Sequence, residues 1–314
     1  MSLHKFSKAN NDGRIRAVIF DLDDTLISEY EFVVSGYRFV SEKLAGRLDK
    51  TAPEIEDRLW ELSKETYSRA FNRLFDSYGV SCSEEELKEL ISAYRNHPAD
   101  TRFYPDVAMT LTGLKDRGIL MGIISDGDPG RQRNKIRSAV AGIPDDLHKY
   151  PKNEGDDVGL HHDKTWIETK GLHNLSSGMA EDDLHDKAGS TGSLHKISNK
   201  KTESESFAGG WFDEVILNDE FGGIEYRKPN PKGFREMARR LGVEPSEMIY
   251  IGDNPAKDFH ISVELPVRTV RIVRENGIYT NREYLDGIKE TWRIDSLTDI
   301  LGIVDKNNEI VNIN

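Results

Sequence analysis

Short apolar runs recur along this chain, each followed by a small or acidic residue and then by a helix-like segment, and they constrain its fold more than any other feature. The runs cover Ala17–Phe20, Ile119–Ile124, Val215–Leu217, Met248–Ile251 and Val267–Val273. Strands that are buried on both faces are continuously hydrophobic, as in parallel sheets that helices cover on both sides. The sequence therefore predicts a doubly wound α/β fold, in which ligands bind at the carboxyl ends of the strands.

Length and charge exclude several classes of protein. A chain of 314 residues allows two domains, or one domain with insertions. It holds no apolar run of the roughly 18 residues that a membrane span needs, so we expect no membrane segment. Its formal net charge of −12, without a block of Lys and Arg, gives no reason to expect nucleic acid as a partner.

The single cysteine, Cys82, and the lack of a signal-peptide pattern favour a cytoplasmic protein. The sequence does not indicate the oligomeric state.

Residues 28–104, between the first two runs, have the periodicity of helices. One apolar stripe consists of Val33, Tyr37, Val40, Leu44 and Leu48. Two pairs fit the capping-box spacing of helix starts, Thr51 with Glu54 and Ser83 with Glu86. These features predict a helical cap over the carboxyl edge of a core that comprises residues 14–27, 105–137 and 211–314.

Residues 138–210 differ from the rest of the chain. Apolar residues are scarce there, six of the nine histidines lie there, and a Leu-His pair recurs about every twelve residues. Such a composition predicts a polar, low-complexity insert that is largely disordered. The histidines lack the paired spacing of a preformed zinc site. A right-handed crossover would place the insert at the amino edge of the sheet, away from the ligand edge.

Two carboxylates, Asp21 and Asp23, follow the first run directly. An Asp-rich turn can act as a simple helix cap. However, two buried carboxylates at one strand end are costly unless a cation or a reacting group requires them. The pair therefore indicates a candidate site.

The other strand ends would add polar groups to the same edge. They are Ser125, which with the following amides can hold an anion, Lys228, a compact cation, and Asp253 and Asp258, two more carboxylates. Hard oxygen ligands in this number suit Mg²⁺. Arg131 and Arg133 follow the second strand closely and could reach an anionic substrate, but solvated helix positions are expected for them.

Taken in their order along the chain, the polar motifs at these strand ends resemble those of the haloacid dehalogenase superfamily of hydrolases. The matching residues are Asp21, Asp23 and Thr25 in Asp-x-Asp-x-Thr, then Ser125, then Lys228, then Gly252, Asp253 and Asp258 in Gly-Asp-x4-Asp. The resemblance covers residues 14–137 and 211–305, and the helices between the first two motifs resemble a type-one cap. Gln132–Lys135 and Gly252–Pro255 are similar to a branch that resembles phosphoglycolate phosphatase.

This resemblance implies a Mg²⁺-dependent phosphatase that hydrolyses a small phosphorylated metabolite. Asp21 would attack phosphorus and form an aspartyl-phosphate, and Asp23 would serve as acid and then base. Ser125 and Lys228 would hold the phosphate oxygens.

The metal would be held by Asp21, the backbone carbonyl of Asp23, and Asp253. Asp258 would contact it through water, orient Lys228, or make a structural hydrogen bond. The sequence does not indicate which metabolite is hydrolysed or which cap residues select it.

Two alternatives remain. A haloacid dehalogenase is disfavoured, because halide departure needs no proton and the residue two after Asp21 is an acid. A binding or regulatory protein that kept this fold and uses the insert would not need Asp21, Asp23, Lys228 and Asp253 together.

Overall fold

The computed structural model describes residues 13–143, 208–275 and 277–311. The predicted insert therefore falls mostly outside the described residues. A parallel sheet of six strands forms the core of the described chain, in the order β3-β2-β1-β4-β5-β6. The strands are β1 (Ala17–Phe20), β2 (Leu120–Ser125), β3 (Glu214–Leu217), β4 (Met248–Gly252), β5 (Arg268–Ile272) and β6 (Trp292–Ile294).

The five predicted strands are all present, with ends that differ by at most a few residues. In β1 and β4 every residue is buried, which explains why these two central strands are apolar throughout, whereas β5 also carries Arg268, Thr269 and Arg271. The doubly wound α/β prediction is confirmed. The edge strand β6 was not predicted, because its three residues form no apolar run.

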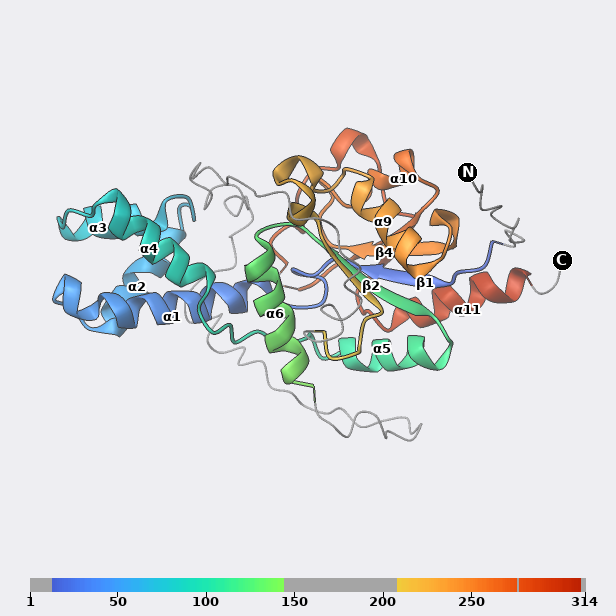
Figure 1. The fold of residues 1–314 in the computed structure, drawn as a ribbon, viewed down its shortest axis with the longest axis horizontal. Helices are drawn as coiled ribbons and strands as arrows, with labels where there is room; N and C mark the ends of the chain where they lie inside the picture. Colours follow the sequence, from blue (N-terminus) through green and yellow to red (C-terminus); the bar gives the residue numbers. More distant parts are fainter. Residues whose placement is uncertain (1–12, 144–207, 276, 312–314) are drawn as a thin grey trace, which may run out of the picture.

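Helices cover both faces of the sheet, as Figure 1 shows. On one face α5 (Val107–Asp116), α6 (Pro129–Ala141) and α11 (Asp299–Val311) contribute to a single apolar cluster with alternate strand residues. On the other face α9 (Lys232–Leu241) and α10 (Ile261–Glu264) pack against the remaining strand residues. Short 3-10 turns complete the described core, at Asn218–Phe221, Ile224–Tyr226, Pro245–Glu247 and Leu285–Gly287.

Four helices form a separate layer to the left of the sheet in Figure 1, namely α1 (Glu29–Leu48), α2 (Ala52–Ser63), α3 (Ala70–Tyr78) and α4 (Glu84–Arg95). They enclose their own apolar cluster, and the whole predicted stripe of α1 is buried in it. The Thr51 side chain accepts from the Glu54 amide, and the Glu54 side chain accepts from the Thr51 amide, which completes the predicted capping box. The Ser83 hydroxyl likewise accepts from the Glu86 amide.

The strand order reverses between β1 and β4, which are hydrogen-bonded neighbours. At such a point the connections leave toward opposite sides, so a crevice opens beyond the carboxyl ends of the two strands. The residues that follow Phe20 and Gly252 therefore meet at this edge.

The two described flanks of the insert lie close to each other at the far end of α6. Helix α6 continues to Ala141, beyond residue 137 where we placed the end of the core segment. Ile143 and Ala208 belong to the same apolar cluster, and a Cβ on Gly209 would lie 2.5 Å from the Val140 Cγ1. The chain thus leaves and re-enters the described core at nearly one place.

No helix among the described residues combines the length and apolar character needed to cross a membrane.

Candidate active site

Asp21 is the first residue after β1, and the sheet itself fixes its position. Its amide donates to the Ile251 carbonyl of β4 at 2.8 Å, so the backbone remains attached to the neighbouring strand. Its Oδ1 accepts from the Leu22 amide at 2.8 Å and lies 2.7 Å from the Lys228 Nζ. The side chain is thus oriented by a backbone donor and a buried cation.

Lys228 lies among three carboxylates, of which Asp21 and Asp258 are the nearest and Asp126 is 3.9 Å away. Besides Asp21, its Nζ is 3.1 Å from Asp258 Oδ1 and 2.7 Å from the Tyr250 hydroxyl, which itself donates to Asp258 at 3.0 Å. Burial opposes the charge of the ammonium, but Asp21 and Asp258 outweigh it and raise the pKa of Lys228. The lysine therefore carries a full positive charge beside Asp21.

Asp258 can approach this closely because residue 252 is a glycine. A Cβ on Gly252 would lie 2.5 Å from Asp258 Oδ2. That oxygen accepts from the Asn254 amide at 2.8 Å, and the other oxygen faces Lys228 and Tyr250. Since both oxygens are engaged, the geometry favours the orientation of Lys228 among the roles expected for Asp258.

Asp126 was not predicted as a site residue, yet it holds the loop that carries Lys228. Its Oδ1 accepts from the Asn218 side chain at 2.7 Å and from the Lys228 amide at 3.1 Å. Its Oδ2 lies 3.3 Å from the Lys257 Nζ, which adds a second cation to this edge. The acidic residue after Ser125 could have been noticed in the sequence, but nothing there indicated its partners.

Asp23 lies in a different environment from Asp21. Its Oδ1 is 2.7 Å from the Lys135 Nζ, and its Oδ2 accepts from the Gln132 Nε2 at 2.9 Å. The same Gln132 nitrogen is 3.0 Å from the Ser125 Oγ at the end of β2. Two carboxylates, two residues apart, thus contact different cations and different elements.

Asp24, the third acidic residue of this turn, connects the core to the cap. Its φ of 51° is left-handed, and its two oxygens accept from the amides of Glu29 in α1 and Ile278 beyond β5. Burial raises its pKa to about 6, although both amide donors favour the charged form. Its contacts indicate a structural role, because they join the turn after β1 to the start of α1 and to the segment after β5.

Asp21, Asp253 and Asp258 offer oxygens that all lie within 4.8 Å of one another. Asp253 is buried, and its Oδ2 has no hydrogen-bond partner among the described residues. Burial raises the pKa of Asp21 to about 7, although Lys228 opposes this, and burial together with Asp24 raises the pKa of Asp253 well above its usual range. A divalent cation would remove this penalty, and the oxygen donors suit Mg²⁺. The Asp23 side chain lies outside this group and leaves only its backbone for such a role.

Arg131 contradicts the expectation of a solvated helix position. It is 4% exposed, and its guanidinium lies against Gly127, where a Cβ would be 2.9 Å from Nη2. Gly127 has a φ of 104°, a left-handed conformation that favours glycine at this turn. Arg133 is partly exposed and forms an ion pair with Glu220, in agreement with the expectation.

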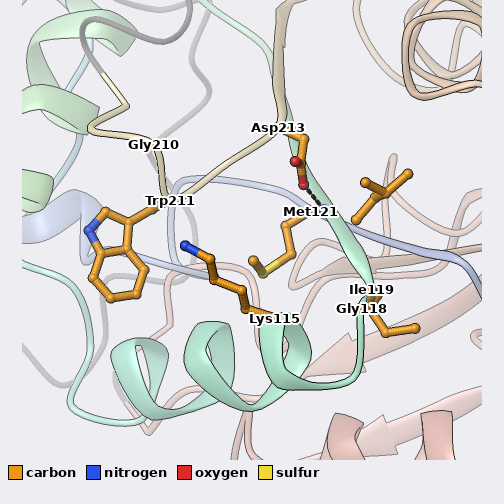
Figure 2. Close-up of a pocket in the computed structure, with 8 residues that line it drawn as sticks. Lys115, Gly118, Ile119, Met121, Gly210, Trp211 and Asp213 are labelled. Atoms are coloured by element: carbon orange, nitrogen blue, oxygen red, sulfur yellow. Dashed lines mark hydrogen bonds between the residues drawn. The ribbon is translucent and has the colours of Figure 1, made fainter. Parts of the chain in front are cut away.

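A separate cavity of about 200 Å³ lies at the opposite end of β2 (Figure 2). Its walls carry few groups suited to phosphate chemistry, and the hydrogen bond drawn there joins the Asp213 carboxylate to the Met121 amide. The lining residues are Lys115, Gly118, Ile119, Leu120, Met121, Gly210, Trp211 and Asp213. The candidate site at the carboxyl edge is therefore distinct from this cavity.

Comparison with known families agrees with the motifs. A model described as haloacid dehalogenase-like hydrolase matches residues 18–140, and a second with the same description matches residues 190–259. A related hydrolase-like model of this group matches residues 225–300. Together the matches include every strand-end motif at the site.

Several curated relatives align with most of the chain. The glyceraldehyde 3-phosphate phosphatase of Methanopyrus kandleri is 27% identical over 302 residues, which is 92% of this chain and 97% of that protein. The pyrophosphatase PpaX of Bacillus velezensis is 24% identical and covers 77% of this chain and 76% of its own. The solved structure of the HAD-hydrolase YfnB from Bacillus subtilis is 13% identical, with a TM-score of 0.50 over 93% of this chain and 99% of that chain, and supports the fold.

Proposed function

This chain belongs to the haloacid dehalogenase-like hydrolases, and from that membership we propose that it hydrolyses a small phosphorylated metabolite through an aspartyl-phosphate on Asp21. One observation carries the proposal. Asp21 and Asp23 both follow β1 but have separate partners. Asp21 contacts the Lys228 ammonium, and Asp23 contacts Lys135 and Gln132 of α6. Two carboxylates in different environments suit two different roles in one reaction.

In the first step an Asp21 oxygen attacks phosphorus and the ester bond to the leaving oxygen breaks. Asp23, in its protonated form, gives its proton to that oxygen. Lys228 and the Ser125 hydroxyl contact the phosphate oxygens and stabilise the charge that develops on them.

In the second step water attacks the phosphorus of the aspartyl-phosphate while Asp23, now a carboxylate, takes a proton from it. Phosphate leaves and Asp21 is regenerated. The Asp23 acid is what separates this reaction from halide displacement, which needs no proton on the leaving group.

Asp21, Asp253 and the backbone carbonyl of Asp23 would hold Mg²⁺. The bound cation would screen the repulsion between the Asp21 carboxylate and the anionic phosphate. Asp258 would act through Lys228, whose ammonium it contacts at 3.1 Å.

The names of the relatives suggest where to look for a substrate. Glyceraldehyde 3-phosphate phosphatases and pyrophosphatases are among them, so a three-carbon phosphate ester and pyrophosphate head the candidates. The helical layer α1–α4 would restrict access to compact substrates.

The test is phosphate release from glyceraldehyde 3-phosphate, pyrophosphate, phosphoglycolate, sugar phosphates and nucleoside monophosphates, with Mg²⁺ and with a chelator. We expect turnover of at least one compact ester with Mg²⁺ that the chelator abolishes. Release of halide from a 2-haloacid, without phosphate release from any ester, would contradict the proposal.

A further inference from the structure

Two residues of helix α6, Gln132 and Lys135, contact the Asp23 carboxylate from one side. They are three residues apart, so both point from the same face of the helix toward the end of β1. The Gln132 Nε2 lies 2.9 Å from Asp23 Oδ2, and the Lys135 Nζ lies 2.7 Å from Asp23 Oδ1. Each carboxylate oxygen therefore has its own donor.

The Lys135 side chain is fully buried, which is costly for an ammonium unless a carboxylate compensates it. Asp23 is the nearest carboxylate, and Glu29 of α1 lies farther away at 3.8 Å. The ammonium also lies 4.8 Å from the centre of the Phe32 ring in α1. Lys135 is therefore placed between Asp23 in the core and the first helix of the cap.

The Gln132 amide joins Asp23 to a second site residue. Besides Asp23, its Nε2 lies within hydrogen-bond distance of the Ser125 Oγ at 3.0 Å and of the Asp126 carbonyl at 2.6 Å. The side chain is fully buried, and its Oε1 has no partner among the described residues. This amide thus fixes Asp23 relative to the strand end that would contact the phosphate.

Proton transfer demands this kind of placement. A general acid must lie within hydrogen-bond reach of the leaving oxygen, and a displacement of about 1 Å can cost roughly 100-fold in rate. Asp23 lies beyond the end of β1, in an isolated β-bridge with Ile27, so the backbone is fixed there but the rotation of the side chain is not. The two donors from helix α6 fix the direction of the carboxyl group.

Building on the proposed function, we propose that Lys135 and Gln132 are positioning residues that hold the Asp23 carboxyl where it protonates the leaving oxygen. They act through Asp23 and do not contact the phosphate. Their loss should therefore matter most for a substrate whose leaving group needs a proton.

The experiment compares kcat/KM for two esters, because kcat/KM reports the steps up to phosphoryl transfer. One is the best alkyl phosphate from the substrate panel, whose alkoxide is a poor leaving group. The other is p-nitrophenyl phosphate, whose phenolate leaves with little need of an acid. The variants are Lys135→Met and Gln132→Met, with Arg133→Met as the matched control, because the Arg133 side chain is partly exposed and pairs with Glu220 rather than with Asp23.

We expect Lys135→Met to lower kcat/KM for the alkyl ester by about 100-fold, within the range that general acid catalysis contributes, and for p-nitrophenyl phosphate by less than about tenfold. Gln132→Met should show the same asymmetry with a smaller loss, and Arg133→Met should change neither ester. Because Gln132 is uncharged, its variant keeps the test valid if Lys135→Met does not fold.

An equal loss on both esters in the folded variants would overturn the inference, because a phosphate contact or a general structural defect affects both alike. No loss on either ester would overturn it as well. A wild-type chain that hydrolyses neither ester would instead contradict the proposed function, so the two failures are distinguishable.

Discussion

Removal of the buried ammonium of Lys228 should destabilise the protein in a pH-dependent way. Its Nζ lies 2.7 Å from Asp21 and 3.1 Å from Asp258, and its side chain is fully buried. Lys228→Met would leave both carboxylates without this cation. Breaking a buried ion pair from one side costs about 3–5 kcal/mol, which we expect as the loss in free energy of unfolding at about pH 8 without divalent ions.

The sign of the pH dependence follows from Asp21. Its pKa is already about 7 with Lys228 present, and without the ammonium it rises further. As the pH falls through this raised pKa, Asp21 of the variant takes up a proton and its uncompensated charge disappears, whereas Asp21 of the wild type is protonated only below about pH 7. The loss caused by Lys228→Met should therefore shrink to about 1–2 kcal/mol at about pH 5.

Urea unfolding of the wild type, Lys228→Met and Lys232→Met at both pH values measures this. Lys232 contacts the face of the Tyr226 ring at 3.9 Å and lies outside the carboxylate cluster, so its variant controls for the loss of one charge. A loss below about 1 kcal/mol at about pH 8, or an equal loss at both pH values, would refute the reasoning.

Three further predictions concern the acid, the metal and the insert. Asp23→Asn should lower kcat by about 100-fold or more and keep the Mg²⁺-induced rise in Tm, since its side chain lies outside the carboxylate group that would bind metal; an unchanged kcat would exclude the acid and base role. Burial raises the pKa of Asp21 to about 7 and raises the pKa of Asp253 well above its usual range, so protons compete with the metal, and Mg²⁺ should raise Tm more at about pH 8 than at about pH 5.5; equal shifts would place the metal elsewhere. Replacement of residues 144–207 by a short Gly/Ser linker should leave kcat/KM nearly unchanged and Tm no lower, because Gly209 adjoins Val140 and long loops close at modest entropic cost; a loss above about tenfold would show that the insert reaches the site.

The strand ends could be predicted because a parallel sheet leaves a clear trace in the sequence. The central strands β1 and β4 are apolar throughout, and the chemistry begins where each run stops, as at Phe20 and Ile251. Parallel pairing then brings these ends to one edge, so residues far apart in the chain could be grouped without a structure. Asp21 and Asp253, which directly follow β1 and β4 and whose carboxylate oxygens lie within 4.8 Å of each other, are the clearest example.

Gln132 and Lys135 could not be assigned to the site in the same way. They lie within a helix, and their roles depend on which face of α6 is turned toward β1, which the crossover geometry decides. The adjacent buried residues Ile136 and Ala139 mark that face, so a polar pair beside an apolar stripe was the available signal. The solvated position expected for Arg131 was wrong for the same reason, because a helical arginine near a strand end can face either solvent or the turn before the helix.

The covalent intermediate tests the account most directly. Wild type and Asp21→Asn are mixed with the best substrate and Mg²⁺, quenched in acid within the first turnover, digested, and examined by mass spectrometry for a phosphorylated peptide. We predict phosphate on Asp21 in the wild type. In the variant we predict no phosphorylated peptide and phosphate release below about a tenth of the wild-type rate. Turnover without a phosphorylated Asp21, or substantial release by Asp21→Asn, would contradict the account.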